Sequence, residues 1–245
     1  MKHFISYFDY LGFKEFLTNN TVEELERRSY HLLAEIERSL SESIKRRPLK
    51  PTVADLSQSN INCLNISDTV IFWTKDDTLD SCKELLQVSF RFNSMNNLFQ
   101  IPVRGCMIYD DFNIITGISK NVKGTIYKPN MMYGKGLLNA HIKTEQLNWA
   151  GSVIDNSVIL KVVELGQNNS FFKEFAKEYN VPYKKGIKKK EFAFLLRNKE
   201  GFNKNEFESD KKRIMETFKK DNKQITSSVK EKMENSIEFL KSEIK

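Results

Sequence analysis

Two aspartates stand at the ends of short apolar runs, in positions where a carboxylate can do chemistry. Asp9 follows the apolar and aromatic run of residues 3–8, and Asp68 lies between the runs 61–66 and 69–73. Each run has the length and composition of a buried β-strand, so we expect Asp9 at a strand end and Asp68 at the tip of a β-hairpin. In one sheet the two carboxylates can lie side by side. Such a pair suits Mg²⁺, which keeps several waters and takes further oxygens from substrate phosphates.

The residues after Asp9 add a second part of such a site. Leu11, Gly12 and Phe13 form a glycine-containing turn before a predicted helix, where backbone N–H groups would face phosphate oxygens. Together these features predict the outline of a phosphoryl-transfer site. A structural interpretation stays open beside it, in which Asp9 caps the following helix and Asp68 is the polar residue of a hairpin turn.

The elements around these residues follow a defined order. A capping box at Thr21 and Glu24 starts a long amphipathic helix, which is expected to continue through Ile44 and to stop at Pro48. The next elements are a loop over 50–60, a helix over 79–97, a strand over 101–109, a hairpin partner over 112–116, a polar loop to residue 130, a helix over 136–149 and a strand over 152–161. The order βαββαβ predicts an α+β, ferredoxin-like fold.

The last third of the chain differs from the rest in charge. The net charge of +7 arises entirely from residues 165–245. Apolar residues recur there at helical spacing from Phe171 onward, so residues 1–163 are predicted to form the main domain and residues 164–245 a basic helical extension. A lysine cluster around Gly186 could contact nucleic acid. The helical pattern on both sides of it favours an appendage that packs on the main domain or supports a dimer.

Composition places the chain among globular proteins of a reducing compartment. It has 245 residues, of which 40% are hydrophobic, and its 10 glycines and 5 prolines argue against collagen-like and long disordered chains. Cys63, Cys82 and Cys106 stand far apart, which argues against a disulfide framework or a structural zinc site. No apolar run approaches the roughly 20 residues of a membrane span, and Asp9 comes too early for a secretory signal. We therefore expect a soluble, cytoplasmic protein.

Four blocks of sequence occur in an order that resembles a known family. They are FDYLGF at residues 8–13, ISDTVI at 66–71, VRGCMI at 103–108 and YGKGLLNA at 133–140. The series resembles the class III nucleotidyl cyclase domain over about residues 3–160. The amino-acid sequence of the blocks is most similar to the pyrimidine cyclases of bacterial Pycsar antiphage systems. The resemblance implies conversion of UTP or CTP into 3′,5′-cyclic UMP or CMP and pyrophosphate, as a second messenger for a separate effector protein.

The resemblance also implies roles for individual residues. Asp9 and Asp68 look like the ligands of two divalent metal ions, Mg²⁺ or Mn²⁺, with the backbone carbonyl of Tyr10 as a further ligand. The amides of residues 12–13 would hold phosphates. Arg104 resembles the family's phosphate-contacting arginine, and a surface or sheet-edge ion pair is the alternative interpretation. In this family the sites lie across a homodimer interface, so the resemblance implies a homodimer.

The base-recognition position departs from the purine cyclases. Those enzymes place a lysine four residues before the second metal aspartate, where this chain has Leu64. The resemblance therefore implies a pyrimidine pocket rather than an adenine pocket. Asn62 and Asn65, on the strand that leads to Asp68, are the candidate base contacts, because an amide offers both a donor and an acceptor. The alternative interpretation for each is an ordinary strand or turn asparagine.

The helix after the fourth block departs further from the family pattern. Purine cyclases carry an asparagine and a transition-state arginine there, whereas the nearest positions here are the apolar Leu138 and Ile142. Asn139, His141 and Lys143 are out of register but chemically able to substitute. These departures motivate a second hypothesis, a catalytically silent cyclase-fold module that binds a nucleotide or a protein. A third, nucleic-acid binding through the basic tail, predicts an affinity that falls steeply with salt.

Overall fold

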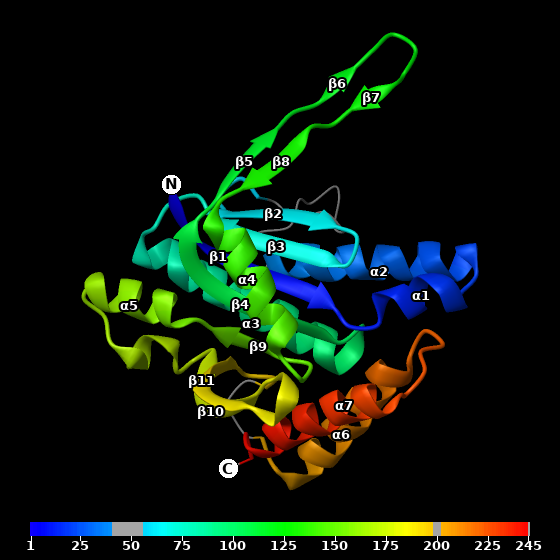
Figure 1. Ribbon diagram of the computed structural model, residues 1–245, viewed down its shortest axis with the longest axis vertical. Helices are drawn as coiled ribbons and strands as arrows, with labels where there is room; N and C mark the ends of the chain where they lie inside the picture. Colours follow the sequence, from blue (N-terminus) through cyan, green and yellow to red (C-terminus); the bar gives the residue numbers. More distant parts are fainter. Residues whose placement is uncertain (41–55, 198–201, 245) are drawn as a thin grey trace.

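The computed structural model describes residues 1–40, 56–197 and 202–244. Within them, seven strands form one sheet in the order β10-β11-β9-β4-β1-β3-β2 (Figure 1). Neighbouring strands run antiparallel, apart from β4 and β9, which are parallel. The strands of this sheet are β1 (Lys2–Tyr10), β2 (Ile61–Ile66), β3 (Thr69–Thr74), β4 (Val103–Asp111), β9 (Ser152–Ile154), β10 (Ala176–Pro182) and β11 (Lys188–Phe194).

The predicted α+β fold class is confirmed, because helices between the strands cover a mostly antiparallel sheet. The helices are α1 (Phe13–Asn19), α2 (Val22–Leu40), α3 (Leu79–Phe99), α4 (Lys135–Gln146), α5 (Asn156–Glu164), α6 (Lys204–Lys219) and α7 (Ser227–Lys241). The expected continuation of α2 through Ile44 to Pro48 lies outside the described residues, as does the loop over residues 50–55.

One face of the sheet is buried beneath α2, α3 and α5. Successive side chains of a strand point to opposite faces. On β1, Phe4, Phe8 and Tyr10 enter this side and share a core with α3 residues such as Leu85 and Phe92. The core fixes the register of β1, because a shift by one residue would move every apolar side chain to the other face. The position of the strand end that carries the first aspartate is fixed with it.

The opposite face of the sheet is covered only in part. Ile5 and Tyr7 of β1 pack there with Ile108 of β4 and Ala140 of α4. Asp9 is the next β1 residue on this face, and its side chain is 16% exposed. The side chain of Asp9 is therefore largely buried, with only a small part in contact with solvent.

Residues 113–133 form a two-stranded arm. The strand expected over 112–116 is present, but it pairs with a later strand and not with the strand before it, and further short strands replace part of the polar loop expected up to residue 130. β5 (Asn113–Thr116) pairs with β8 (Asn130–Tyr133), and β6 (Ser119–Lys120) pairs with β7 (Ile126–Tyr127). Figure 1 shows the arm projecting from the body of the protein. Its β-branched and aromatic residues favour strands over a loop. The exposed large apolar residues of the arm are Ile115, Ile118, Val122, Ile126, Tyr127, Met131 and Tyr133.

The segment after residue 164 is not wholly helical, which corrects the sequence prediction. β10 and β11 form an antiparallel hairpin, and β11 pairs with β9, so this segment extends the main sheet. Tyr179, assigned to a helical stripe from its spacing, lies in β10, because a short apolar run fits either periodicity. The predicted strand over 152–161 is also shorter, since Asp155 accepts from the N–H of Ser157 and caps α5.

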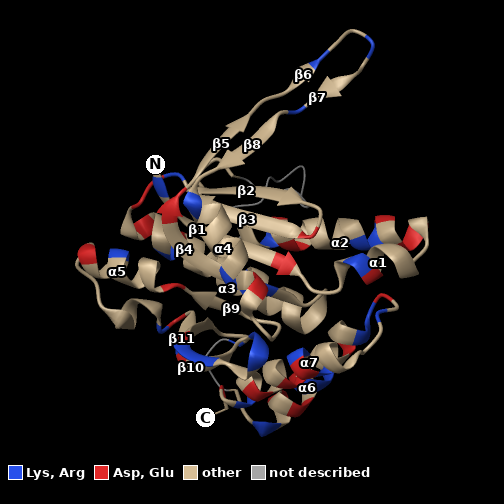
Figure 2. Ribbon diagram, viewed as in Figure 1, with Lys and Arg blue, Asp and Glu red and all other residues tan. Residues whose placement is uncertain are grey.

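Helices α6 and α7 form the helical part of the C-terminal region and pack as a hairpin (Figure 1). Their apolar residues, including Ile214, Phe218 and Phe239, share a core with Trp149. Figure 2 shows Lys and Arg interspersed with Asp and Glu over both helices. The basic tail is thus a packed element whose surface carries both charges. Among residues 1–40, 56–197 and 202–244, none of the helices combines the length and apolar character needed to cross a membrane.

Candidate functional site

Asp9 lies in a chain of ion pairs at the end of β1. The register of the sheet places Asp9 opposite Arg104 on β4 and Thr69 on β3. Nε and Nη2 of Arg104 each lie 2.9 Å from Oδ2 of Asp9, and the guanidinium also contacts the carboxylate of Glu145 on α4. Nζ of Lys184 approaches the other oxygen of Glu145 at 3.6 Å. Arg104 was predicted from the sequence, whereas Glu145 was not, because only the packing of α4 on the sheet brings Glu145 to this position.

Asp68 occupies the tip of the β2–β3 hairpin, next to the end of β1. Ser67, at φ +56°, takes the left-handed conformation in this tight turn. The N–H of Tyr10 donates to the carbonyl oxygen of Asp68 over 2.9 Å, which fixes the turn against β1. The structure thus brings Asp9 and Asp68 together at one edge of the sheet.

The charge of Asp9 is only partly compensated. Burial raises the pKa of its carboxyl above the usual value, although the guanidinium of Arg104 opposes this shift. The negative charges of Asp68 and Glu145 raise the pKa further. A further cation beside Asp9 would stabilise its ionised form.

The donor set at this edge fits a divalent cation that takes few protein ligands. Within the described residues, no group of three or more His, Cys, Asp or Glu side chains forms a complete metal cage. Two carboxylates are sufficient for Mg²⁺ where waters and substrate phosphates complete its octahedral shell. The residues that would hold such an ion are Asp9, Asp68 and the backbone of Tyr10.

The turn after β1 is built around Gly12. Gly12 has φ +77°, a left-handed conformation that glycine adopts without strain, and it immediately precedes α1. Leu11 packs toward the core of α6 and α7, whereas Phe13 stacks on the ring of Tyr10. The side chain of Tyr10 is itself buried beneath α3. The N–H of Leu11 donates to the carbonyl oxygen of Pro102 over 2.7 Å, which corrects the prediction that this amide faces phosphates. The turn therefore offers the amides of Gly12 and Phe13, and no charged side chain, to a ligand.

An open pocket of about 520 Å³ lies beside Asp68 on the α4 face. Its lining includes Tyr7, whose hydroxyl oxygen lies 3.3 Å from Oγ1 of Thr69 and 3.1 Å from Nδ1 of His141. Burial raises the pKa of the Tyr7 hydroxyl. The remaining wall is largely apolar, with side chains such as Leu137. Sequence analysis did not identify Tyr7 or Thr69, because the three polar groups meet only through the packing of α4 on the sheet.

The predicted base-contact residues lie on two different faces of β2. The register places Asn62 and Leu64 on the α4 face, where Leu64 packs against the apolar cluster beneath that helix. Asn65 lies on the opposite face, and its side-chain amide donates to the carbonyl oxygen of Thr69 over 3.1 Å. Asn62 and Leu64 thus share the face that carries the pocket and Asn65 does not, but none of the three is among the residues that line the pocket.

The polar residues of α4 have separate environments. The amide of Asn139 donates to a carboxylate oxygen of Asp110 over 2.9 Å, at the far end of β4 from Arg104. Nζ of Lys143 forms ion pairs with two carboxylates, at 2.7 and 2.6 Å. His141 is the member of the three that lines the pocket described above.

Comparisons with known proteins show the fold of the chain. No family model and no curated protein sequence matches it. Among solved structures, it is similar to the dimeric guanylyl cyclase domain of the RhoGC fusion protein from the aquatic fungus Blastocladiella emersonii, with a TM-score of 0.50 and 11% identity, covering 79% of this chain and 96% of that one. It is also similar to the catalytic core of a rhodopsin-guanylyl cyclase with converted specificity, with a TM-score of 0.49 and 10% identity, covering 80% and 96%. The chain therefore has the fold of class III nucleotidyl cyclase domains.

Proposed function

We propose that this chain is a metal-dependent nucleotidyl cyclase that converts UTP or CTP into the 3′,5′-cyclic monophosphate and pyrophosphate. The observation that carries the proposal is the meeting of Asp9 and Asp68 at one sheet edge, beside Arg104, in a fold shared with guanylyl cyclase domains. The alternative role of Asp9 as a helix cap is not supported, because α1 begins after Gly12 and has no side-chain cap.

The reaction is an attack of the ribose 3′-hydroxyl oxygen on the α-phosphorus, which forms the cyclic ester and breaks the bond to pyrophosphate. A divalent ion held by Asp9 and Asp68 would neutralise phosphate oxygens and lower the pKa of the attacking hydroxyl. Arg104 would add positive charge near the phosphates, although its guanidinium is also engaged in the ion pairs with Asp9 and Glu145 that were the alternative interpretation. The proton of the 3′-hydroxyl leaves to solvent. Because the ribose hydroxyl is itself the nucleophile, the reaction needs no His or Cys nucleophile.

The residue at the base-recognition position supports a pyrimidine as the base. Leu64 stands where the resembling purine cyclases have a lysine, and its apolar side chain packs on the α4 face, outside the residues that line the pocket. Tyr7, Thr69 and His141 supply groups that can donate to or accept from a base or a ribose. The proposal extends to the use of the cyclic product as a second messenger, read by a separate effector protein in antiphage defence.

The test incubates the purified chain separately with UTP, CTP, ATP and GTP, each with Mg²⁺ or Mn²⁺, and identifies the products by mass spectrometry. The expected result is one cyclic pyrimidine nucleotide and pyrophosphate, both lost when a chelator removes the metal. A cyclic purine product would support the proposed cyclase reaction but contradict the proposed pyrimidine substrate.

A catalytically silent, nucleotide-binding module is the second candidate. It is favoured by Leu138 and Ile142 of α4, which are 58% and 51% exposed and stand nearest to the positions of the family's transition-state residues. In this case the chain binds a nucleotide together with metal but releases no pyrophosphate from any of the four substrates. Saturable nucleotide binding without product in the assay above would therefore select this candidate.

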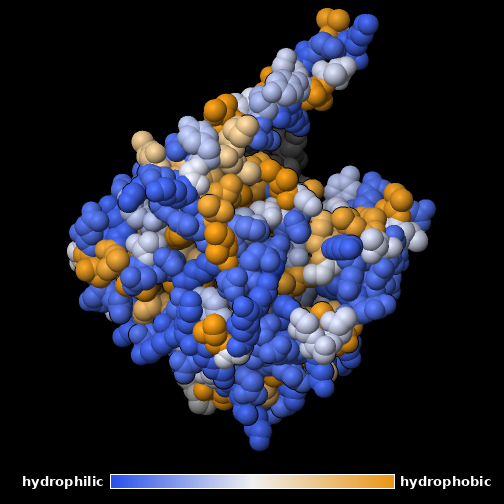
Figure 3. All heavy atoms as spheres, in the orientation of Figure 1, coloured by the Kyte–Doolittle hydropathy of each residue, from blue (hydrophilic) through white to orange (hydrophobic). Residues whose placement is uncertain are grey.

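We also propose that two copies of the chain associate through the half-open α4 face. Ile66, Tyr133 and Leu138 line the pocket beside Asp68 and are 44%, 52% and 58% exposed. Figure 3 shows apolar surface from the foot of the arm across the region where Figure 1 places α4. Exposed apolar surface next to a half-open pocket is typical of a face that another protein covers. A second copy of the chain would cover the open side of the pocket beside Asp68.

Replacing Leu138 with aspartate is expected to weaken self-association at least about tenfold, because a twofold-symmetric contact buries the side chain twice. Sedimentation equilibrium of the full chain measures the effect. Leu160→Asp is the matched control, since Leu160 is 61% exposed on α5, which packs on the other face of the sheet. A monomeric wild type, or equal effects of the two substitutions, would contradict the proposed dimer.

A further inference from the structure

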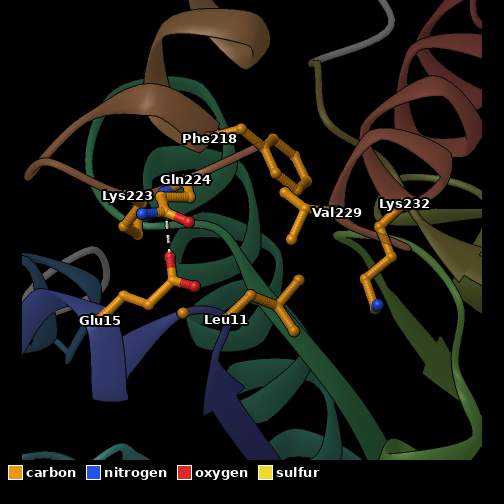
Figure 4. A pocket seen from close by; sticks show the side chains of 8 residues that line it. Leu11, Glu15, Phe218, Lys223, Gln224, Val229 and Lys232 are labelled. Carbon is orange, nitrogen blue, oxygen red and sulfur yellow. Dashed lines mark hydrogen bonds between the residues drawn. The ribbon is translucent and has the colours of Figure 1, made fainter. Parts of the chain in front are cut away.

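A second, smaller pocket lies on the other side of the β1–α1 turn. It has a volume of about 90 Å³ and is lined by Leu11, Gly12, Glu15, Phe218, Lys223, Gln224, Val229 and Lys232. The first three belong to the turn and α1, and the other five belong to the α6–α7 hairpin (Figure 4). The hairpin thus brings two lysines to a turn that has no charged ligand of its own. A pocket of this size is too small for a nucleoside.

The side chain of Lys223 packs against the backbone of Gly12. A Cβ atom at position 12 would come within 2.8 Å of Cδ of Lys223, so only a glycine leaves room for this side chain. Nζ of Lys223 is buried and has no hydrogen-bond partner among the described residues. The nearby carboxylate of Glu15 accepts from the N–H of Gln224 over 3.1 Å instead. Lys223 therefore holds its ammonium group buried beside the turn, without a hydrogen-bond partner among the described residues.

The loop before Lys223 is clamped in place by contacts with α1 and α2. Asp221 and Asn222 both take the left-handed conformation, at φ +63° and +56°. Asp221 accepts from Nε and Nη2 of Arg28 at 2.8 and 3.1 Å, and both side chains of this ion pair are nearly buried. The side-chain amide of Asn20 donates to the carbonyl oxygen of Asp221 over 2.8 Å. The unpaired ammonium is thus held in position and is not a mobile surface lysine.

Lys232 of α7 is the second lysine that lines this pocket, and Arg104, the partner of Asp9, is among its charged neighbours. Nζ of Lys232 donates to Oγ of Ser228 over 2.7 Å, and it has no ion pair with a carboxylate among the described residues. Burial lowers the pKa of Lys232, and the positive charges of Arg104 and Lys184 lower it further. Figure 4 shows Lys223 and Lys232 on either side of Leu11. The carboxylates of Glu231 and Glu145 oppose this lowering of the Lys232 pKa, so Lys232 has neighbours of both charges.

We propose that Lys223 and Lys232 bind the outer phosphates of the substrate and the pyrophosphate product, so that the α6–α7 hairpin completes the phosphate site of its own chain. The assignment to a nucleotide rests on the proposed function, whereas the polyphosphate chemistry rests on the pocket itself. An ammonium without a partner, next to backbone groups and in an apolar wall, suits a compact polyanion. The hairpin is then part of the active site and not only a support for the fold.

The first test is isothermal titration calorimetry of the full chain with inorganic pyrophosphate and with tripolyphosphate, in the presence of Mg²⁺. Lys223→Met and Lys232→Met are each expected to weaken binding about 10- to 100-fold, the cost of one charge-assisted contact. Lys219→Met is the matched control, an exposed lysine of the same hairpin, and should leave the affinity within about twofold. Wild type without polyphosphate affinity, or equal affinities in all three variants, would overturn the proposal.

The stability of Lys223→Met separates a binding role from a structural one. Burial lowers the pKa of Lys223 to about 8, with Asp221, Arg28, Glu15 and Lys220 as the charged neighbours. Between pH 8 and the usual lysine value, the folded chain has lost a proton that the unfolded chain keeps, so wild-type stability rises with pH. The Tm of Lys223→Met should therefore exceed that of wild type below pH 8 and approach it near pH 10. A lower Tm in the variant at every pH would show a structural lysine and overturn the proposal.

Activity then distinguishes this inference from the proposed function. If the chain binds tripolyphosphate through Lys223 but forms no cyclic product, the proposed polyphosphate site is supported and the proposed cyclase function is contradicted. Conversely, if the chain is an active cyclase and kcat/KM is unchanged in both lysine variants, only the proposed polyphosphate site is contradicted. If both proposals hold, kcat/KM should fall about 10- to 100-fold in each lysine variant and stay unchanged in Lys219→Met.

Discussion

Replacing either Asp9 or Asp68 with asparagine is expected to lower the rate of cyclic-nucleotide formation at least about a thousandfold. Asparagine keeps the size of the side chain but removes the charge that would hold a divalent cation. A metal contact that stabilises transition-state charge contributes several kcal/mol, and each ~1.4 kcal/mol is a factor of ten in rate. Initial rates at saturating nucleotide, measured over a range of Mn²⁺ concentrations, test this expectation for both variants.

The matched control is Asp111→Asn. Asp111 is exposed and lies on β4 opposite Lys2, at the other end of the sheet from the proposed site. The same substitution there should change the rate by less than about twofold, and all three variants should show cooperative thermal unfolding. If Asp9→Asn and Asp68→Asn both kept their rates within tenfold of wild type, the metal roles assigned to these carboxylates would be wrong.

The parts of the site that the sequence predicted are those encoded within a few residues. The run of residues 3–8 alternates between two buried faces, which identifies β1 and places Asp9 at its end. The hairpin around Asp68 is specified by two apolar runs and a two-residue polar turn. The fold class follows from the order of such local elements. Period-two alternation also separates Asn62 from Asn65, a signal that was present in the sequence but not used.

The remaining parts depend on contacts between distant segments. The carboxylate of Glu145 reaches Arg104 only because α4 packs on β4, and the α6–α7 hairpin covers Gly12 from near the other end of the chain. Neither contact has a local pattern that would reveal it. The run around Tyr179 fits a helix as well as a strand, and the pairing of β10 with β11 decides between them. Long-range packing therefore settles what periodicity alone leaves open.

Replacing Asp221 with asparagine is expected to lower the free energy of unfolding by roughly 3–5 kcal/mol, because it leaves the guanidinium of Arg28 buried without its countercharge. The two side chains are only 6% and 7% exposed. Asparagine tolerates the left-handed conformation that position 221 requires, so the substitution isolates the loss of charge. Urea denaturation monitored by circular dichroism measures the difference. Glu234→Gln, in an exposed pair with Lys230, is the matched control and should cost less than about 1 kcal/mol.

The double variant Arg28→Met/Asp221→Asn tests the physical cause. Removing both charges also removes the uncompensated guanidinium, so most of the stability lost in Asp221→Asn should return. A double variant as unstable as the single one would show that the loop is held by shape or hydrogen bonds instead of this ion pair. The same loop carries Lys223, so Asp221→Asn should also weaken pyrophosphate binding under conditions where the chain stays folded. Stability and phosphate affinity would then be coupled through a single clamp between α2 and the C-terminal hairpin.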